Sequence, residues 1–161
     1  MTEFDYIVFP IRIYHDDVLD TAEVYRLLQE WLALRDYTLY EKEYHVDART
    51  EHNVSVYWRA EKKVDDYTQF VIEVRIKGNN IEEVTVKNKK YIRGIYNVSF
   101  ESFLETDYEQ RWEHKPLLKI WRGLYDRLFI KDKMDRFSEE LRNDTYNIYD
   151  ELKAFLSLKK F

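Results

Sequence analysis

Alternating apolar and polar residues predict a series of β-strands up to residue 104. The first covers residues 4–14, where Pro10 has no N–H for a strand ladder and therefore predicts an edge strand or a bulge. Five further stretches alternate, and the sequence Gly-Asn-Asn at 78–80 predicts a turn between two of them. These later predicted strands are residues 39–47, 54–62, 68–77, 81–87 and 91–104.

Helical spacing of apolar residues predicts two further regions. After Asp16 and Asp17, which suit a helix N-terminus, apolar side chains recur every three or four residues to about Arg35. A long helical region is predicted from Pro116, because proline is favoured in the first turn. The apolar positions of its second segment are Met134, Phe137, Leu141, Ile148, Leu152, Phe155 and Leu156.

This order of elements predicts an α+β fold. Alternation that buries one face of each strand is typical of an antiparallel sheet, here curved and of about six strands. One N-terminal helix follows strand 1, and the long C-terminal helical region is expected to pack on the sheet. Because no linker, repeat or low-complexity segment interrupts the sequence, we expect a single domain over residues 1–161.

The order of elements resembles the helix-grip fold of the START and Bet v1-like superfamily, which includes polyketide cyclases and lipid carriers. The resemblance covers most of the chain and is carried by element order, without a residue motif. The chain departs from it by having one N-terminal helix where many members have two, and by lacking a glycine-rich loop between early strands. The resemblance implies a cavity for an apolar ligand between the sheet and the C-terminal helix. It assigns no catalytic residue.

Aromatic residues at predicted inward positions give a separate reason to expect a ligand cavity. Inward tyrosine hydroxyls need hydrogen-bond partners, which a pocket with ligand or water supplies. The alternative is that these side chains fill a solid core, as apolar stripes usually do. The hypothesis is a non-catalytic binding module that holds a small apolar or aromatic ligand between the sheet and the C-terminal helix. Its candidate ligand-binding residues are Tyr40, Tyr44, Trp58, Phe70, Tyr96, Trp121 and Tyr125.

Composition and charge narrow the classes of function. The 161 residues carry a formal net charge of −5, so the chain as a whole lacks the basic footprint of non-specific nucleic-acid binding. Three glycines leave no phosphate-binding loop, and the absence of cysteine excludes disulfides, thiolate metal sites and thiol catalysis. We find no secretory signal and no apolar run long enough to span a membrane, and we therefore expect a cytoplasmic protein without a cofactor.

Polar clusters offer few candidates for chemistry. Residues 45–52 hold two histidines and two acids, but their spacing matches no metal motif, and polar residues suit a hairpin tip. His15 and the adjacent aspartates would serve either as a base with an orienting acid or as part of a helix cap. Alternation puts Glu41 and Glu43 together on the solvated strand face. We predict no metal site and no catalytic residue. An enzyme, such as a cyclase or hydrolase by fold analogy, stays a third possibility.

Residues 111–133, RWEHKPLLKIWRGLYDRLFIKDK, mix large apolar side chains with basic ones in an otherwise acidic chain. In one interpretation the apolar stripe is core, and the Lys and Arg stems lie along its edges. In the other, part of the stripe is exposed and docks on an anionic membrane surface or a protein partner. The basic residues that would contact such a partner are Arg111, Lys115, Lys119, Arg122 and Arg127.

Overall fold

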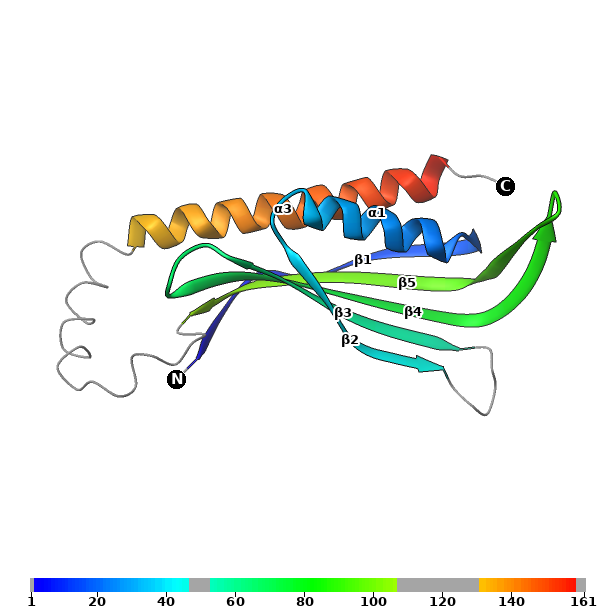
Figure 1. Ribbon diagram of the computed structural model, residues 1–161, viewed down its shortest axis with the longest axis horizontal. Helices are drawn as coiled ribbons and strands as arrows, with labels where there is room; N and C mark the ends of the chain where they lie inside the picture. The colour runs from blue at the N-terminus through cyan, green and yellow to red at the C-terminus, as the bar shows by residue number, and fades with distance from the viewer. Residues whose placement is uncertain (1, 47–52, 107–130, 159–161) are drawn as a thin grey trace.

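The computed structural model describes residues 2–46, 53–106 and 131–158, and within them one sheet carries two helices on one face (Figure 1). The sheet is open and antiparallel, with five described strands in the order β1-β5-β4-β3-β2. We call the helix-covered face the inner face and the opposite one the outer face. The elements are β1 (Glu3–Leu19), α1 (Thr21–Ala33), β2 (Thr38–Val46), β3 (Val54–Lys63), β4 (Thr68–Val86), β5 (Lys89–Thr106) and α3 (Lys131–Leu158).

The predicted α+β class is confirmed, but the described sheet has five strands rather than about six. The two predicted strands 68–77 and 81–87 are one strand, β4, because residues 78–80 form no hairpin turn. A register shift between Asn79 and Glu82 marks a bulge there, and Asn80 has a φ of 53°. The hairpin turn lies at Lys87 and Asn88, whose φ values of 48° and 64° suit a two-residue loop.

Past this bulge, the ends of β4 and β5 bend toward the helix side of the sheet (Figure 1). Gly78 lies next to the bulge and pairs with Tyr96 on β5. A Cβ atom at Gly78 would lie 2.9 Å from Ile81 Cδ1 and 3.0 Å from Tyr96 Cε1. Glycine at this position therefore lets the tyrosine ring pack directly against the backbone of the neighbouring strand.

Strand β1 is an edge strand with two register shifts, between Tyr6 and Val8 and between Val8 and Ile11. Both features agree with the prediction from Pro10, which lies inside the irregular stretch. The irregularity also changes which side chains are buried. Phe9 is 74% exposed and its ring stacks on that of Tyr6, with 6.3 Å between ring centroids.

Helix α1 begins later than the sequence predicts. Asp16 and Asp17 pair with residues of β5, so the backbone is still in a strand where a helix N-terminus was expected. The N-cap is Asp20, whose Oδ1 accepts a hydrogen bond from the Glu23 backbone N–H at 3.1 Å. Four residues of α1 face the core: Val24, Leu28, Trp31 and Leu32.

Helix α3 confirms the second predicted helical segment, and it packs on β5 and β1. Leu141, Ile148 and Leu152 are fully buried against the sheet. Near the helix centre, the buried Thr145 hydroxyl is hydrogen-bonded to that of Ser102 on β5 at 2.8 Å. The predicted start of this region at Pro116 lies outside the described residues. Neither described helix is both long and apolar enough to cross a bilayer.

Asp65 joins the β3–β4 connection to the start of α3. Its Oδ1 accepts hydrogen bonds from the backbone N–H groups of Tyr67 at 2.8 Å and Thr68 at 2.5 Å. Its Oδ2 lies 2.7 Å from Lys133 Nζ. Partial burial acts to raise the pKa of Asp65, but the hydrogen bonds from Lys133 and the two backbone groups outweigh it and hold that pKa below its ordinary value.

We expect Asp65→Asn to lower the free energy of unfolding by about 1 kcal/mol at pH 7, because the charge that strengthens these bonds is lost. The pKa of Asp65 is lower in the folded protein than in the unfolded chain, where it is roughly 3.9. The charge therefore adds stability at pH values above the unfolded-state pKa. This stability is lost as the pH falls through the folded-state pKa. The difference between wild type and variant should therefore shrink below about pH 4. Urea unfolding from pH 7 to pH 2.5 measures it, with the exposed neighbour substitution Asp66→Asn as control. A difference that does not change with pH contradicts the role of this charge.

Candidate functional site

A cavity of about 560 Å³ lies between α1 and the inner face of the sheet. Its described walls come from Leu19, the first turns of α1, facing residues of β2 and β3, and the bent ends of β4 and β5. The bulge in β4 helps to form it, because Ile81, just past the bulge, and Ile92 opposite it form part of the wall. Most of the lining is apolar, and Val24, Val56 and Ile76 contribute to it.

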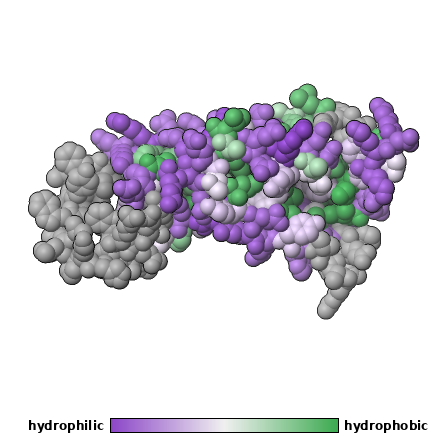
Figure 2. Space-filling model, viewed as in Figure 1, coloured by the Kyte–Doolittle hydropathy of each residue, from purple (hydrophilic) through white to green (hydrophobic). Residues whose placement is uncertain are grey.

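Three of the predicted ligand-binding residues line this cavity: Tyr44 on β2, Trp58 on β3 and Tyr96 on β5. Trp58 and Tyr96 are buried, whereas Tyr44 is 65% exposed and stands at the solvent side. The Trp58 ring meets that of Tyr25 on α1 edge-on, with 5.1 Å between centroids. In Figure 2, hydrophobic surface interrupts the hydrophilic cover in the part of the molecule that contains α1.

Two other predicted ligand-binding residues that the structure describes, Tyr40 and Phe70, do not line the cavity. Phe70 is fully buried in the core, edge-on to Phe137 of α3 at 5.6 Å. Tyr40 pairs with Arg59, and because directly paired residues share a sheet face, it points to the outer face rather than inward. Trp121 and Tyr125 lie outside the described residues. The cavity thus adjoins α1, and no described residue of α3 lines it.

A bulge in β2 explains why Tyr40 and Tyr44 face opposite ways. The register shifts between Glu41, which pairs with Trp58, and Glu43, which pairs with Tyr57. The two glutamates therefore lie on opposite faces, so the prediction that they share a strand face is wrong, although both side chains are exposed as predicted. Glu41 lines the cavity instead. Lys42, the inserted residue, is an ordinary strand residue, so the sequence carries no signal of this bulge.

The described lining of the cavity has few polar groups, and they differ in whether they have a hydrogen-bond partner. Burial raises the pKa of Tyr96 to about 12, so this hydroxyl stays neutral at physiological pH. It donates a long hydrogen bond of 3.4 Å to the carbonyl of Ile92. The indole Nε1 of Trp58 is buried and has no hydrogen-bond partner among the residues that the structure describes. Glu41 is the one charged side chain among the described lining residues.

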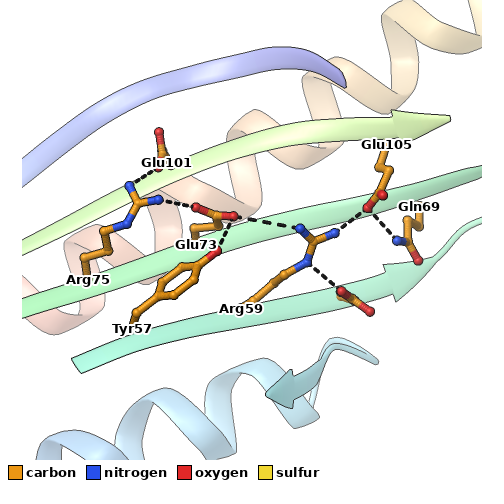
Figure 3. Close-up of polar contacts among 8 residues, drawn as sticks. Tyr57, Arg59, Gln69, Glu73, Arg75, Glu101 and Glu105 are labelled. Atoms are coloured by element: carbon orange, nitrogen blue, oxygen red, sulfur yellow. Dashed lines mark hydrogen bonds and ion pairs between the residues drawn. The ribbon is translucent and has the colours of Figure 1, made fainter. Parts of the chain in front are cut away.

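The outer face of the sheet carries a network of ion pairs around Arg59 and Arg75 (Figure 3). Arg59 is paired with Glu105, with Glu61 at 2.6 Å and, more distantly, with Glu73 at 3.9 Å. Arg75 links the same Glu73, at 2.7 Å, to a further carboxylate. The remaining contacts are Arg75 with Glu101, Gln69 with Glu105 at 2.7 Å and Tyr57 with Glu73 at 2.6 Å.

The surroundings of this network raise the pKa of its tyrosine and of both its arginines. Burial, together with the hydrogen bond to Glu73, raises the pKa of Tyr57 to about 12. Partial burial acts to lower the pKa of Arg59, but the bond to Glu61 and the nearby carboxylates outweigh it and raise that pKa. The alternation of Glu73 and Arg75 along β4 signals a polar face, but it does not reveal which strands supply their partners.

The remaining candidate residues do not form a site in the described part of the chain. His45 pairs with Ser55 on β3, and the rest of the 45–52 cluster lies outside the described residues except for Val46, a strand residue. Within the described ranges, no group of three or more His, Asp or Glu residues is placed to hold a metal. His15 Nε2 lies 3.2 Å from the Val18 carbonyl oxygen. The basic residues proposed to contact a partner, Arg111, Lys115, Lys119, Arg122 and Arg127, all lie outside the described residues.

Comparison with known proteins assigns no family to this chain. No protein-family model matches it, and neither does any curated protein or solved structure. The resemblance to the START and Bet v1-like superfamily therefore stays a proposal that is based on the order of elements. The cavity and its lining are the best basis for inferring a function.

Proposed function

We propose that this protein is a non-catalytic binding module that holds a small apolar or aromatic ligand between α1 and the sheet. The observation that supports it is the cavity itself. Its volume of about 560 Å³ falls among those of small-molecule sites, which are concave, mostly apolar and provided with a few polar groups. A helix-grip protein would also hold an apolar ligand, but against the C-terminal helix, where side chains such as Phe70 and Leu152 are fully buried here.

The chemistry of the lining favours binding over reaction. A ligand that buries about 200 Å² of apolar surface would gain roughly 5 kcal/mol before the cost of its immobilisation. The indole N–H of Trp58 has no acceptor among the described residues, so a ligand oxygen that reached it would supply a missing hydrogen bond. The described lining contains no Ser, His or Lys, so the commonest nucleophiles and bases are missing from it.

The proposal predicts that filling the cavity abolishes binding without unfolding the protein. We would titrate the full chain with N-phenyl-1-naphthylamine, a neutral fluorescent probe, and expect saturable binding of one molecule per chain. Val56→Trp should weaken that binding at least tenfold, because Val56 is a half-buried wall residue and the larger ring occupies the cavity.

The matched control is Val84→Trp, since Val84 is also half buried on a strand but is not part of the lining. This variant should bind the probe like wild type. Thermal unfolding followed by circular dichroism checks that both variants fold. Non-saturable binding by wild type, or equal affinities of the two folded variants, would contradict the proposal.

A further inference from the structure

The walls of the cavity combine aromatic faces with one carboxylate. Tyr25, Tyr44, Trp58 and Tyr96 come from four different elements, so rings surround the space from several sides. Glu41 and Trp58 are directly paired across β2 and β3, which puts their Cβ atoms about 5 Å apart on the same face. The carboxylate therefore lies beside the largest ring of the wall.

The Glu41 carboxylate has no counter-charge among the described residues. No described lysine or arginine lines the cavity, and no ion pair involves Glu41 within the described ranges. The adjacent Lys42 is directed elsewhere, because its Nζ lies 5.2 Å from the ring centroid of Tyr40, on the outer face. Glu41 is an exposed side chain, so it puts a solvated negative charge at the open side of the apolar and aromatic lining, within reach of the charged group of a bound ligand.

We infer that the ligand of this cavity is an amphipathic organic cation, whose ammonium group lies between Glu41 and the rings of Tyr44 and Trp58 while its apolar body lies among the isoleucines and valines. This inference rests on the proposed function, and it names the chemical class of the ligand. Aromatic faces attract cations through their negative quadrupole, and ammonium groups that carry alkyl substituents suit such sites best. An anionic ligand of the same shape would be repelled by Glu41.

An inorganic cation fits the same site poorly. A metal ion needs several oxygen or nitrogen ligands, and Glu41 is the one carboxylate among the described lining residues. The other described oxygen groups of the lining, such as those of Thr21 and Asn53, are neutral, and most of the lining is rings and aliphatic side chains. An alkylammonium group needs none, because it gains from the charge of one carboxylate and from contact with the rings.

Three probes that share a ten-carbon chain test the inference on the full-length protein by isothermal titration calorimetry, below their micelle concentrations. They are decyltrimethylammonium, neutral decanol and anionic decanoate. We expect the cation to bind about fivefold or more tighter than decanol, and decanoate to bind weakest. Glu41→Gln should remove the preference for the cation and leave decanol affinity unchanged. Glu43→Gln, two residues along β2 on the opposite face, should change neither affinity.

The outcomes separate this inference from the proposed function. If decanol and the cation bind wild type equally, or Glu41→Gln keeps the preference, the inference is overturned while the binding module stands. If no probe binds wild type, both are overturned. A second measurement needs no variant: raising the salt concentration should weaken binding of the cation but not of decanol, and an equal response of the two contradicts the role of Glu41.

Discussion

Arg59→Met should lower the free energy of unfolding by about 3 kcal/mol, measured by urea unfolding at pH 7. The methionine keeps much of the apolar stem but leaves Glu105 without its ion-pair partner, while Glu73 loses a distant partner and keeps Arg75. Both carboxylates are largely buried, with side-chain exposures of 12% and 8%. Removing one member of a buried ion pair costs far more than an exposed pair contributes, because the charge that stays behind is poorly solvated.

The control for this substitution is Arg26→Met on α1. Arg26 pairs with Glu30 one helical turn away, but both side chains are more than two-thirds exposed. Water and salt screen such a pair, so we expect a loss below about 0.5 kcal/mol. Equal effects at the two positions would mean that the network on the outer face contributes nothing beyond ordinary surface ion pairs.

Polar pairing of this kind suits a sheet whose outer face has no described helix on it. Arg59, Glu73 and Glu105 come from β3, β4 and β5, so the network ties together three adjacent strands. On the inner face, the sheet packs tightly against α3. Between the sheet and the start of α1 lies the cavity. Cross-strand ion pairs on the outer face therefore stabilise the sheet without filling the cavity on the inner face.

The strands and helices were largely predictable because their signal is local. A strand with one buried face must alternate, and a helix packed on a sheet must repeat its apolar residues every three or four positions. The start of α1 was misplaced because Asp16 and Asp17 have the chemistry of a cap, although their backbone is paired with β5. Pairing with a distant strand is a tertiary effect, and no local pattern reports it.

The candidate site was only partly predictable because bulges decide its geometry. Alternation correctly put Trp58 and Tyr96 inward, since β3 and β5 are regular where these residues lie. One inserted residue, Lys42, turned Tyr40 outward and brought Glu41 into the cavity. A bulge changes the phase of the pattern without changing the composition, so counting by twos assigns the wrong face beyond it. The bulge after Gly78 also misled the sequence analysis. Its residues have the composition of a turn, so one bent strand was predicted as two strands.

Phe70 and Tyr44 are both predicted from the sequence to face inward, but one lies in the core and the other at the cavity. Phe70 is fully buried under α3 and packs edge-on against Phe137. Phe70→Ala should therefore lower the free energy of unfolding by about 3–5 kcal/mol, since it removes apolar burial and leaves a void in a solid core. Tyr44 also points to the inner face but is 65% exposed at the cavity. Tyr44→Ala should change stability by less than about 0.5 kcal/mol and act on ligand binding instead.

Urea unfolding of both variants, with the naphthylamine and decyltrimethylammonium titrations repeated on Tyr44→Ala, separates the two roles. Substitution of a cavity-wall residue should lower the affinity for the ligand and keep the free energy of unfolding, whereas substitution of a core residue should lower the free energy of unfolding. A small loss for Phe70→Ala would mean that the sheet under α3 is not filled, and a ligand could then lie against the C-terminal helix as the helix-grip resemblance implies. A large loss for Tyr44→Ala would instead make Tyr44 part of the core and close the cavity on that side. The cavity under α1 requires the large loss at Phe70 and the small one at Tyr44 together.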